Sequence, residues 1–449
     1  MLLSFRFANH RSFRDEQQLN LTPLYEGNSA NGSTAAPEAV RVVGVFGANA
    51  SGKSNALNAL AFMRRWATRS DRAVEPGLGV SREPYRLDRD SLSAPSRYVV
   101  DLLLNGVRYT YGFTLDDERV LEEWLYHYPL NRKRRVFERE GDEFKWGEES
   151  GRQGELERIA QITAQTALFL STAARFRQTS QVNSERSLAS PLHDVYLWFL
   201  RIRVRSRPGA HLPRAVEALG PDWENDRPVI TGLLRAADVG IVGIEIRQPT
   251  IQELPFSSDR DLTAGNEIDN AARAKVRETI GSHPRILFTH RGAHGDVLLE
   301  MSDESAGTQQ LLDLAIDAAL VLRTGGTMTV DEIDASLHPM LSAKLIGLFQ
   351  SPVTNPYSGQ LIFTSHDAAL LGTFDTEEVL HRDQIWFTEK ADDGASVLYP
   401  LSDFKPRKAG ENRPRRYLNG NYGGVPDLSS DLFAQALAGR EENDAEAAH

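Results

Sequence analysis

A glycine-rich loop at residues 47–54 has the pattern Gly-x-x-x-x-Gly-Lys-Ser, which is typical of a phosphate-binding loop. It follows the apolar residues 42–46 and precedes a run with helix-forming composition. Glycines let backbone N–H groups approach a phosphate closely, and the following helix adds its positive N-terminal end. We expect Lys53 to reach the β- and γ-phosphates of a nucleoside triphosphate, and Ser54 to ligate Mg²⁺. The expected nucleotide-binding residues are Gly47, Ala48, Asn49, Ala50, Ser51, Gly52, Lys53, Ser54 and Asn55.

Two adjacent carboxylates, Asp331 and Glu332, end the β-rich run 327–330. A buried strand of a parallel sheet delivers the residues at its C-terminal end to the edge where ligands bind. We expect Asp331 to hold Mg²⁺ through a water molecule and Glu332 to polarise an attacking water. Because an apolar strand that ends in Asp-Glu also occurs by chance, this pair carries weight only together with the phosphate loop.

Two further segments contain residue types that suit a phosphate site. Residues 304–308 form a turn of small residues before a helical run, and such a turn offers N–H groups to an anion. His366 ends the apolar run 361–365, where its side chain would touch a γ-phosphate. Each segment has an alternative interpretation, because the turn also suits an ordinary helix N-cap and the histidine also suits a structural role.

The order of these segments resembles that of ABC-type ATPases of the SMC, RecF and OLD group. The resemblance implies that the acidic pair is a Walker B motif and that His366 is a switch histidine. It also implies that Ser305, Gly307 and Thr308 are signature residues that complete the nucleotide site of a second subunit, so that hydrolysis requires at least a homodimer. The implied fold is an α/β P-loop NTPase with an ABC-type split head and an inserted helical lobe, and the implied cofactors are ATP and Mg²⁺.

Three segments resemble the smaller group of OLD-like bacterial ATPases. They are the opening residues 3–13, the Ser-Leu-His-Pro sequence at 336–339 and the C-terminal residues 416–426. This chain also departs from the general ABC pattern. It has no glutamine from residue 19 to residue 152 to serve as a Q-loop glutamine, and His338 stands where many D-loops have aspartate. Ala306 and Thr308 replace the more usual glycines of the signature.

Composition favours a cytoplasmic protein without a membrane partner. The 449 residues are 41% hydrophobic, which suffices for a substantial core in two or three domains. No apolar run reaches the roughly 18 residues that span a bilayer, and the first residues lack a signal-peptide pattern. The absence of cysteine excludes disulfides and thiolate metal sites. A net charge of −11 argues against a surface that binds nucleic acid everywhere.

Two basic clusters remain candidates for local nucleic-acid contacts. The residues Arg201, Arg203 and Arg205 alternate with apolar residues, so an extended chain would project them from one face. A second cluster occupies residues 132–135. Each phosphate contact adds affinity through counterion release. The alternative is a solvated face that is paired with some of the 62 acidic residues of the chain.

The sequence predicts four segments. Residues 1–125 are expected to form an N-terminal ATPase lobe, with strands at 98–104 and 107–113. Residues 126–285 are expected to form a mainly helical insertion, because helical periodicity covers 156–170, 193–199, 229–237 and 268–280. Residues 286–428 are expected to form the C-terminal ATPase lobe, and residues 429–449 a flexible tail.

The expected function follows from the resemblance. OLD-like ATPases commonly work with a nuclease, and the residues after His366 are too few for a nuclease module. We therefore expect an ATP-binding and ATP-hydrolysing protein whose nucleotide-dependent dimerisation switches a separately encoded effector, possibly a nuclease, in bacterial anti-phage defence. The alternative is a RecF-like or SMC-like DNA-repair clamp that binds DNA directly.

Overall fold

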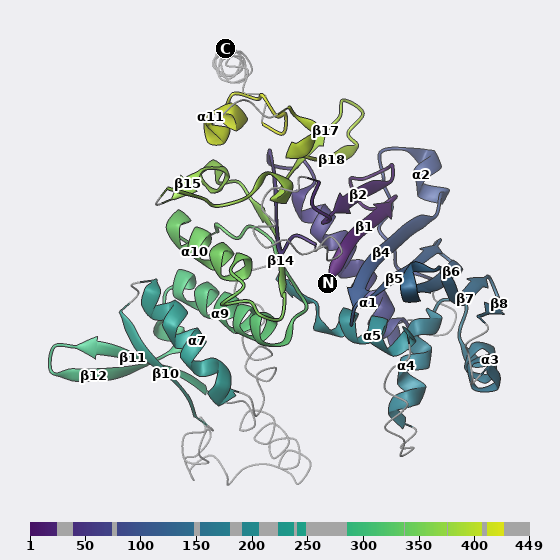
Figure 1. The fold of residues 1–449 in the computed structure, drawn as a ribbon, viewed down its shortest axis with the longest axis horizontal. Helices are drawn as coiled ribbons and strands as arrows, with labels where there is room; N and C mark the ends of the chain where they lie inside the picture. The colour runs from purple at the N-terminus through teal and green to yellow at the C-terminus, as the bar shows by residue number, and fades with distance from the viewer. Residues whose placement is uncertain are drawn as a thin grey trace, which may run out of the picture.

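A computed structural model provides the structure of the chain. It describes residues 1–24, 39–73, 79–147, 153–179, 191–205, 223–237, 240–247, 285–335, 337–374, 376–405 and 411–425. Two large sheets, with one long helix between them, form the centre of the described chain (Figure 1). The predicted α/β class is confirmed.

The core sheet has the strand order β18-β17-β3-β14-β13-β9, and all its strands are parallel except β18. Every residue of β3, β13 and β14 is buried, as expected of a parallel sheet with both faces covered. Strands from both ends of the chain meet here, since β3 lies between β14 and β17. The strand bounds are β3 Val42–Gly47, β9 Arg203–Arg205, β13 Thr327–Val330, β14 Gln360–Ser365, β17 Ile385–Lys390 and β18 Ser396–Pro400.

The second sheet is antiparallel and has the order β2-β1-β4-β5-β6-β7-β8. It contains both strands that the sequence predicts between residues 98 and 113. The strand bounds are β1 Leu2–Ala8, β2 Gln17–Asn20, β4 Ser96–Leu104, β5 Val107–Leu115, β6 Val120–Tyr128, β7 Arg134–Glu140 and β8 Glu143–Trp146.

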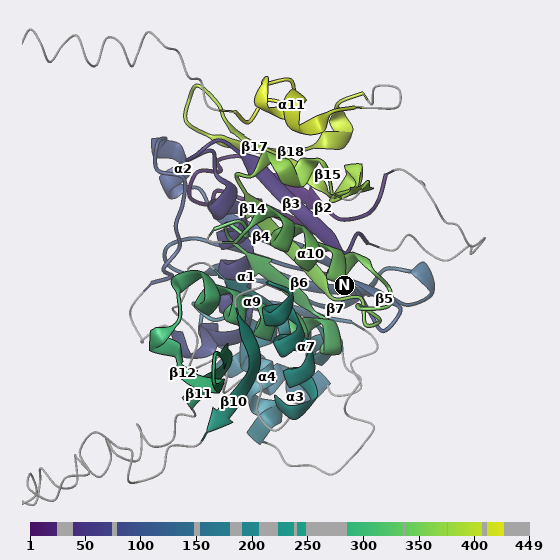
Figure 2. The ribbon, with the colours of Figure 1, turned by 90° about the vertical axis from the view of Figure 1, so that its left-hand side faces the viewer.

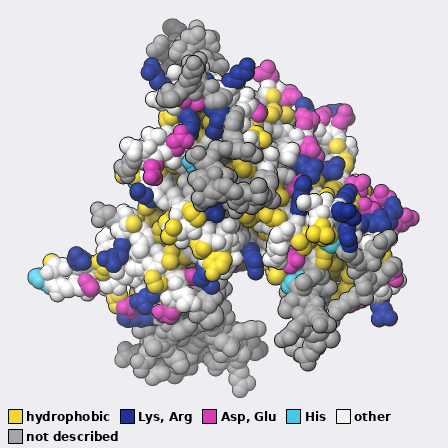
Figure 3. Space-filling view, viewed as in Figure 1, with side chains coloured by type: hydrophobic (Ala, Val, Ile, Leu, Met, Phe, Trp, Pro, Cys, Tyr) yellow, Lys and Arg dark blue, Asp and Glu magenta, His cyan; other side chains and the backbone are white. Residues whose placement is uncertain are grey.

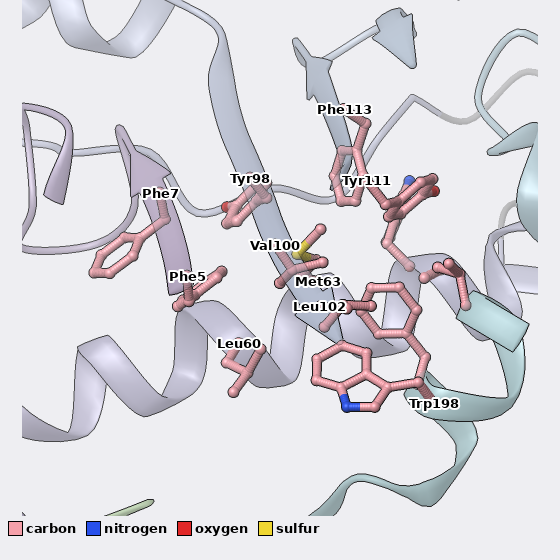
Figure 4. Close-up of a cluster of buried hydrophobic side chains, with 14 of the residues drawn as sticks. Phe5, Phe7, Leu60, Met63, Tyr98, Val100, Leu102, Tyr111, Phe113 and Trp198 are labelled. Carbon is pink, nitrogen blue, oxygen red and sulfur yellow. The ribbon is translucent and has the colours of Figure 1, made fainter. Parts of the chain in front are cut away.

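Helix α1 (Lys53–Ala73) packs between the two sheets. Figure 4 shows Leu60 and Met63 of this helix beside aromatic and aliphatic side chains of the antiparallel sheet, with Trp198 of α5 (Pro191–Arg201) at one side. Successive side chains of β3 point to opposite faces of the core sheet, as in any strand. Val43 and Val45 face α1, whereas Val42 and Phe46 face the opposite side. Fixing α1 against both sheets fixes the loop that precedes it.

Helices α9 (Ala306–Thr324) and α10 (Pro339–Gln350) cover the other face of the core sheet, and α7 (Trp223–Ala236) packs on α9 (Figure 2). A three-stranded sheet, β10-β11-β12, extends from α7 as a narrow projection (Figure 1). The remaining bounds are α2 Arg89–Ser93, α3 Gln153–Ile162, α4 Phe169–Thr179, β10 Ile241–Arg247, β11 Arg285–Gly292, β12 Gly295–Glu300, β15 Thr373–Phe374, β16 Glu377–Glu378 and α11 Arg413–Leu418.

Two expected boundaries fall inside strands. Residue 125 lies within β6, and the sheet that β6 belongs to continues to residue 146. Residue 286 lies within β11. The expected insertion contains helices α3, α4, α5 and α7, but it also contains β9, which pairs with β13 in the core sheet. The expected helix 156–170 divides between α3 and α4, whereas 268–280 and 429–449 lie outside the described residues.

The described helices include none that is both long enough and apolar enough to cross a membrane.

Candidate nucleotide-binding site

The phosphate loop joins β3 to α1, as the sequence predicts. Gly52 has φ +115°, and a Cβ there would lie 2.6 Å from the Ser396 hydroxyl. A Cβ on Gly47 would lie 2.5 Å from the carbonyl oxygen of Thr388. Side chains are therefore excluded at both glycines by close neighbours, and the loop backbone stays open toward a ligand.

The Lys53 side chain lies over the loop, and the residue is 5% exposed. Its Nζ donates to the carbonyl oxygens of Gly47 and Ala48, both at 2.8 Å. Burial lowers the pKa of Lys53, and the nearby Glu332 and Asp331 oppose this shift. A buried ammonium whose hydrogen-bond acceptors are neutral carbonyls fits a site that receives phosphate.

Ser54 and Asp331 form the oxygen pair that a magnesium ion would need. The Ser54 hydroxyl donates to Asp331 Oδ1 at 2.9 Å, across the edge between α1 and β13. Hydroxyl and carboxylate oxygens are the ligands that Mg²⁺ prefers, together with phosphate and water. The pair predicted from widely separated parts of the sequence thus meets at one point.

Glu332 and His366 also meet at this edge. Their side chains lie 3.0 Å apart, from His366 Nε2 to Glu332 Oε1, and both are accessible, with exposed fractions of 39% for His366 and 51% for Glu332. Glu332 has φ +54°, a conformation that non-glycine residues rarely adopt and that is common at functional sites. The structure therefore brings together five residues that the sequence singles out: Lys53, Ser54, Asp331, Glu332 and His366.

Thr364 belongs to this site, although the sequence analysis did not find it. Its hydroxyl donates to Asp331 Oδ1 at 2.7 Å and accepts from the Glu332 backbone N–H at 2.7 Å. It is fully buried in β14, two residues before His366. A threonine in an apolar strand carries no distinctive pattern, so only the register of β14 beside β13 reveals its role.

A second contact supports the phosphate loop from β17. The hydroxyls of Ser51 and Thr388 lie 2.6 Å apart. The C-terminal residues pack against the same strand: the rings of Tyr417 and Tyr422 stack on Phe387, each with 5.6 Å between centroids. This stacking places Gly424 so that a Cβ on it would lie 3.2 Å from the Thr388 carbonyl oxygen.

The expected signature segment begins helix α9. Ser305 is the N-cap and is exposed, and its hydroxyl oxygen accepts from the Thr308 backbone N–H at 3.1 Å. The N-cap interpretation is therefore confirmed, which leaves a role in a second subunit's site as a prediction for Ser305 and Gly307. Thr308 is 6% exposed and its hydroxyl lies 2.9 Å from that of Ser305, so its side chain does not offer a surface contact.

The expected arginine row is corrected by the fold. Arg201 is exposed at the end of α5 and Arg203 is half-buried. Arg205 is 7% exposed, lies 3.2 Å from Asp313 and is also paired with Asp317 of α9. It is therefore a structural residue of the core, because parallel pairing with β13 turns this part of β9 toward α9. Residues 132–135 are exposed, in a region where Figure 3 shows side chains of both charges.

A comparison with curated proteins finds none that matches the chain. Among solved structures, the SMC head domain from Thermotoga maritima is similar, with a TM-score of 0.39 and 13% sequence identity, over 89% of this chain and 98% of that chain. The family model described as "AAA domain, putative AbiEii toxin, Type IV TA system" matches residues 42–372, and the chain belongs to this family of AAA ATPases.

Proposed function

We propose that this protein binds ATP with Mg²⁺, hydrolyses it, and uses ATP-dependent dimerisation to switch a separately encoded effector in bacterial anti-phage defence. The observation that carries the hydrolytic part is the position of Glu332, whose carboxylate lies 3.0 Å from His366 at the edge where Ser54 contacts Asp331. A structural acidic pair would not need an exposed glutamate with φ +54° beside an exposed histidine.

Each residue has a distinct part in this mechanism. The loop N–H groups and Lys53 would hold phosphate oxygens, and Ser54 with Asp331 would hold the metal ion. ATP with Mg²⁺ supplies the phosphoanhydride bond and the cation that offsets its charge. Glu332 would orient a water molecule and accept its proton, while His366 holds the carboxylate by a hydrogen bond.

The effector and defence parts rest on different support. The description of the family names a putative toxin and a toxin–antitoxin system, which is consistent with an ATPase that controls a damaging activity. The Ser-Leu-His-Pro sequence at 336–339 adds the OLD-like resemblance. Dimerisation is proposed because Ser305 and Ala306 are exposed at the start of α9, where a second subunit's nucleotide could meet them. The competing DNA-clamp interpretation loses one expected contact, because Arg205 is buried.

The test is ATP hydrolysis and molecular mass, measured on the wild type and on Glu332→Gln. We expect the variant to bind ATP, to lose hydrolysis by roughly 100-fold or more, and to accumulate as a dimer with ATP bound. Glu118→Gln changes the same chemical group at an exposed turn and serves as the control. Unchanged hydrolysis in Glu332→Gln would remove the glutamate from the mechanism. A monomeric variant that still binds ATP would remove the dimerisation step.

A further inference from the structure

A cleft of about 230 Å³ lies beside α1, away from the phosphate loop. Four arginines line this cleft: Arg11, Arg64, Arg65 and Arg69. Among the described residues that line it, Glu83 alone carries a carboxylate. Glu83 is already engaged, because Arg11 contacts both of its oxygens, at 2.6 and 3.2 Å. Three arginines therefore face the cleft without a share in that ion pair.

The periodicity of α1 explains why these arginines lie together. Ser54, Asn58, Ala61, Arg65 and Arg69 recur every three or four residues and form the accessible stripe of the helix, whereas the opposite stripe is buried between the sheets. Arg65 and Arg69 stand one turn apart, about 6 Å along the helix axis. The stripe begins at Ser54, so the arginine cleft lies on the same side of α1 as the nucleotide site.

Like charges crowd this cleft. Arg64 is half-buried, and its Nε donates to the backbone carbonyl of Phe199 at 3.2 Å. Burial and then repulsion from Arg69 and Arg203 lower the pKa of Arg64. Within the described ranges, no carboxylate lies at ion-pair distance from Arg64, Arg65 or Arg69. In a chain with net charge −11 and 62 acidic residues, such a group of arginines indicates a site for an external anion.

We propose that this arginine cleft binds the phosphate backbone of a nucleic acid. Guanidinium groups match phosphate oxygens with two parallel hydrogen bonds, and a row of them suits a ligand with repeated phosphates. The net negative charge of the protein repels polyanions at long range, so a ligand needs a high local charge density to bind. A nucleic-acid duplex carries one negative charge per roughly 1.7 Å of its axis, together with condensed counterions. Arginines that bind its phosphates release these counterions, and this release favours binding. An acidic protein segment has a lower and less regular charge density.

The cleft replaces the linear arginine row expected from the sequence, and it differs from the nucleotide site. Arg203 adds to its positive charge, whereas Arg205 faces α9. Binding here goes beyond the proposed function, since it requires neither ATP nor an effector. A link to the nucleotide is nevertheless built in, because Arg11 NH1 lies 3.5 Å from the side-chain oxygen of Asn55, in the first turn of α1. A bound strand that displaces Arg11 would act on that turn.

The test measures fluorescence anisotropy of labelled single-stranded DNA, double-stranded DNA and RNA against the full chain without nucleotide, over a series of salt concentrations. The test variant is Arg65→Glu with Arg69→Glu, and the control is Arg119→Glu with Arg158→Glu, which makes the same change of charge at exposed positions outside the cleft and outside both basic clusters. A second variant, Arg65→Gln with Arg69→Gln, removes the charge without reversing it. Circular dichroism melting verifies that each variant folds.

We expect the test variant to weaken binding by roughly 10-fold or more. The slope of log K against log salt concentration should become shallower by about 1.5, because each of the two lost phosphate contacts removes about 0.7 to 0.9 from it. The control should change binding less than about threefold. The three ligands identify which nucleic acid the cleft prefers. Equal losses in test and control, or no binding of any strand, would overturn the proposal. Equally tight binding of polyglutamate would also overturn it and would assign the cleft to an acidic protein.

Discussion

The Thr364 hydroxyl donates to Asp331 Oδ1 at 2.7 Å across the parallel strands β14 and β13. The Thr364 hydroxyl oxygen also accepts a hydrogen bond from the backbone N–H of Glu332 at 2.7 Å. One buried hydroxyl therefore holds the side chain of Asp331, which is expected at the metal, and the backbone of Glu332, whose carboxylate is expected at the water. This relationship makes Thr364 a positioning residue of the site.

We predict that Thr364→Val lowers kcat for ATP hydrolysis by roughly 10-fold or more and destabilises the fold by about 1 to 3 kcal/mol, because two hydrogen bonds of a buried group are lost. Thr364→Ser keeps the hydroxyl and should restore most of the kcat. A role in packing alone would give the opposite order, since valine keeps the shape of threonine and serine does not. Steady-state kinetics and denaturant unfolding of both variants decide between these roles.

The second prediction concerns Gly424, which has φ +64°. A Cβ added to Gly424 would lie 3.5 Å from the Cα of Gly47 in the phosphate loop. Gly424→Ala should raise the KM for ATP several-fold, because the added methyl group presses on β17 and the phosphate loop. Gly106→Ala is the matched control, since Gly106 has φ +76° but nothing within 4 Å of the Cβ position. Both variants carry a backbone strain of about 1 kcal/mol. An equal KM in both would show that the C-terminal segment does not support the loop.

The sequence patterns singled out the local parts of this candidate site, and the structure brings them together. The phosphate loop, the acidic pair at the end of β13 and the histidine after β14 each depend on a short segment, so their types and order suffice. Thr364 and the positive φ of Glu332 depend on how β13 and β14 are aligned, which the sequence does not state. Arg205 was misplaced for the same reason, because its two aspartates lie more than 100 residues away, on α9.

That misplacement leads to a third prediction. Arg205→Met should destabilise the protein by about 3 kcal/mol or more, because Asp313 and Asp317 lose a buried counter-charge. Adding Asp313→Asn and Asp317→Asn should recover part of the lost stability, since the uncompensated charges are then absent. Oligonucleotide binding by folded Arg205→Met should stay within about threefold of wild type. A stable Arg205→Met with weakened oligonucleotide binding would return Arg205 to the surface row.

The last prediction concerns pH. His10 is fully buried, with Nδ1 2.8 Å from the Tyr98 hydroxyl and Nε2 3.1 Å from the Asn58 side-chain oxygen. Burial is the main cause that lowers its pKa from 6.5 to about 4. Between these values the unfolded chain binds the proton and the folded chain does not, so stability is lost as the pH falls below about 6.5.

At pH 5 this loss amounts to about 2 kcal/mol relative to pH 7, by the usual 1.4 kcal/mol per pKa unit. His10→Gln should be less stable at pH 7 and should show a smaller loss between pH 7 and pH 5. His381→Gln, at an exposed histidine, should keep the wild-type difference between the two pH values. Denaturant unfolding of the three proteins at both pH values measures this, and an unchanged pH dependence in His10→Gln would assign the acid sensitivity to other groups.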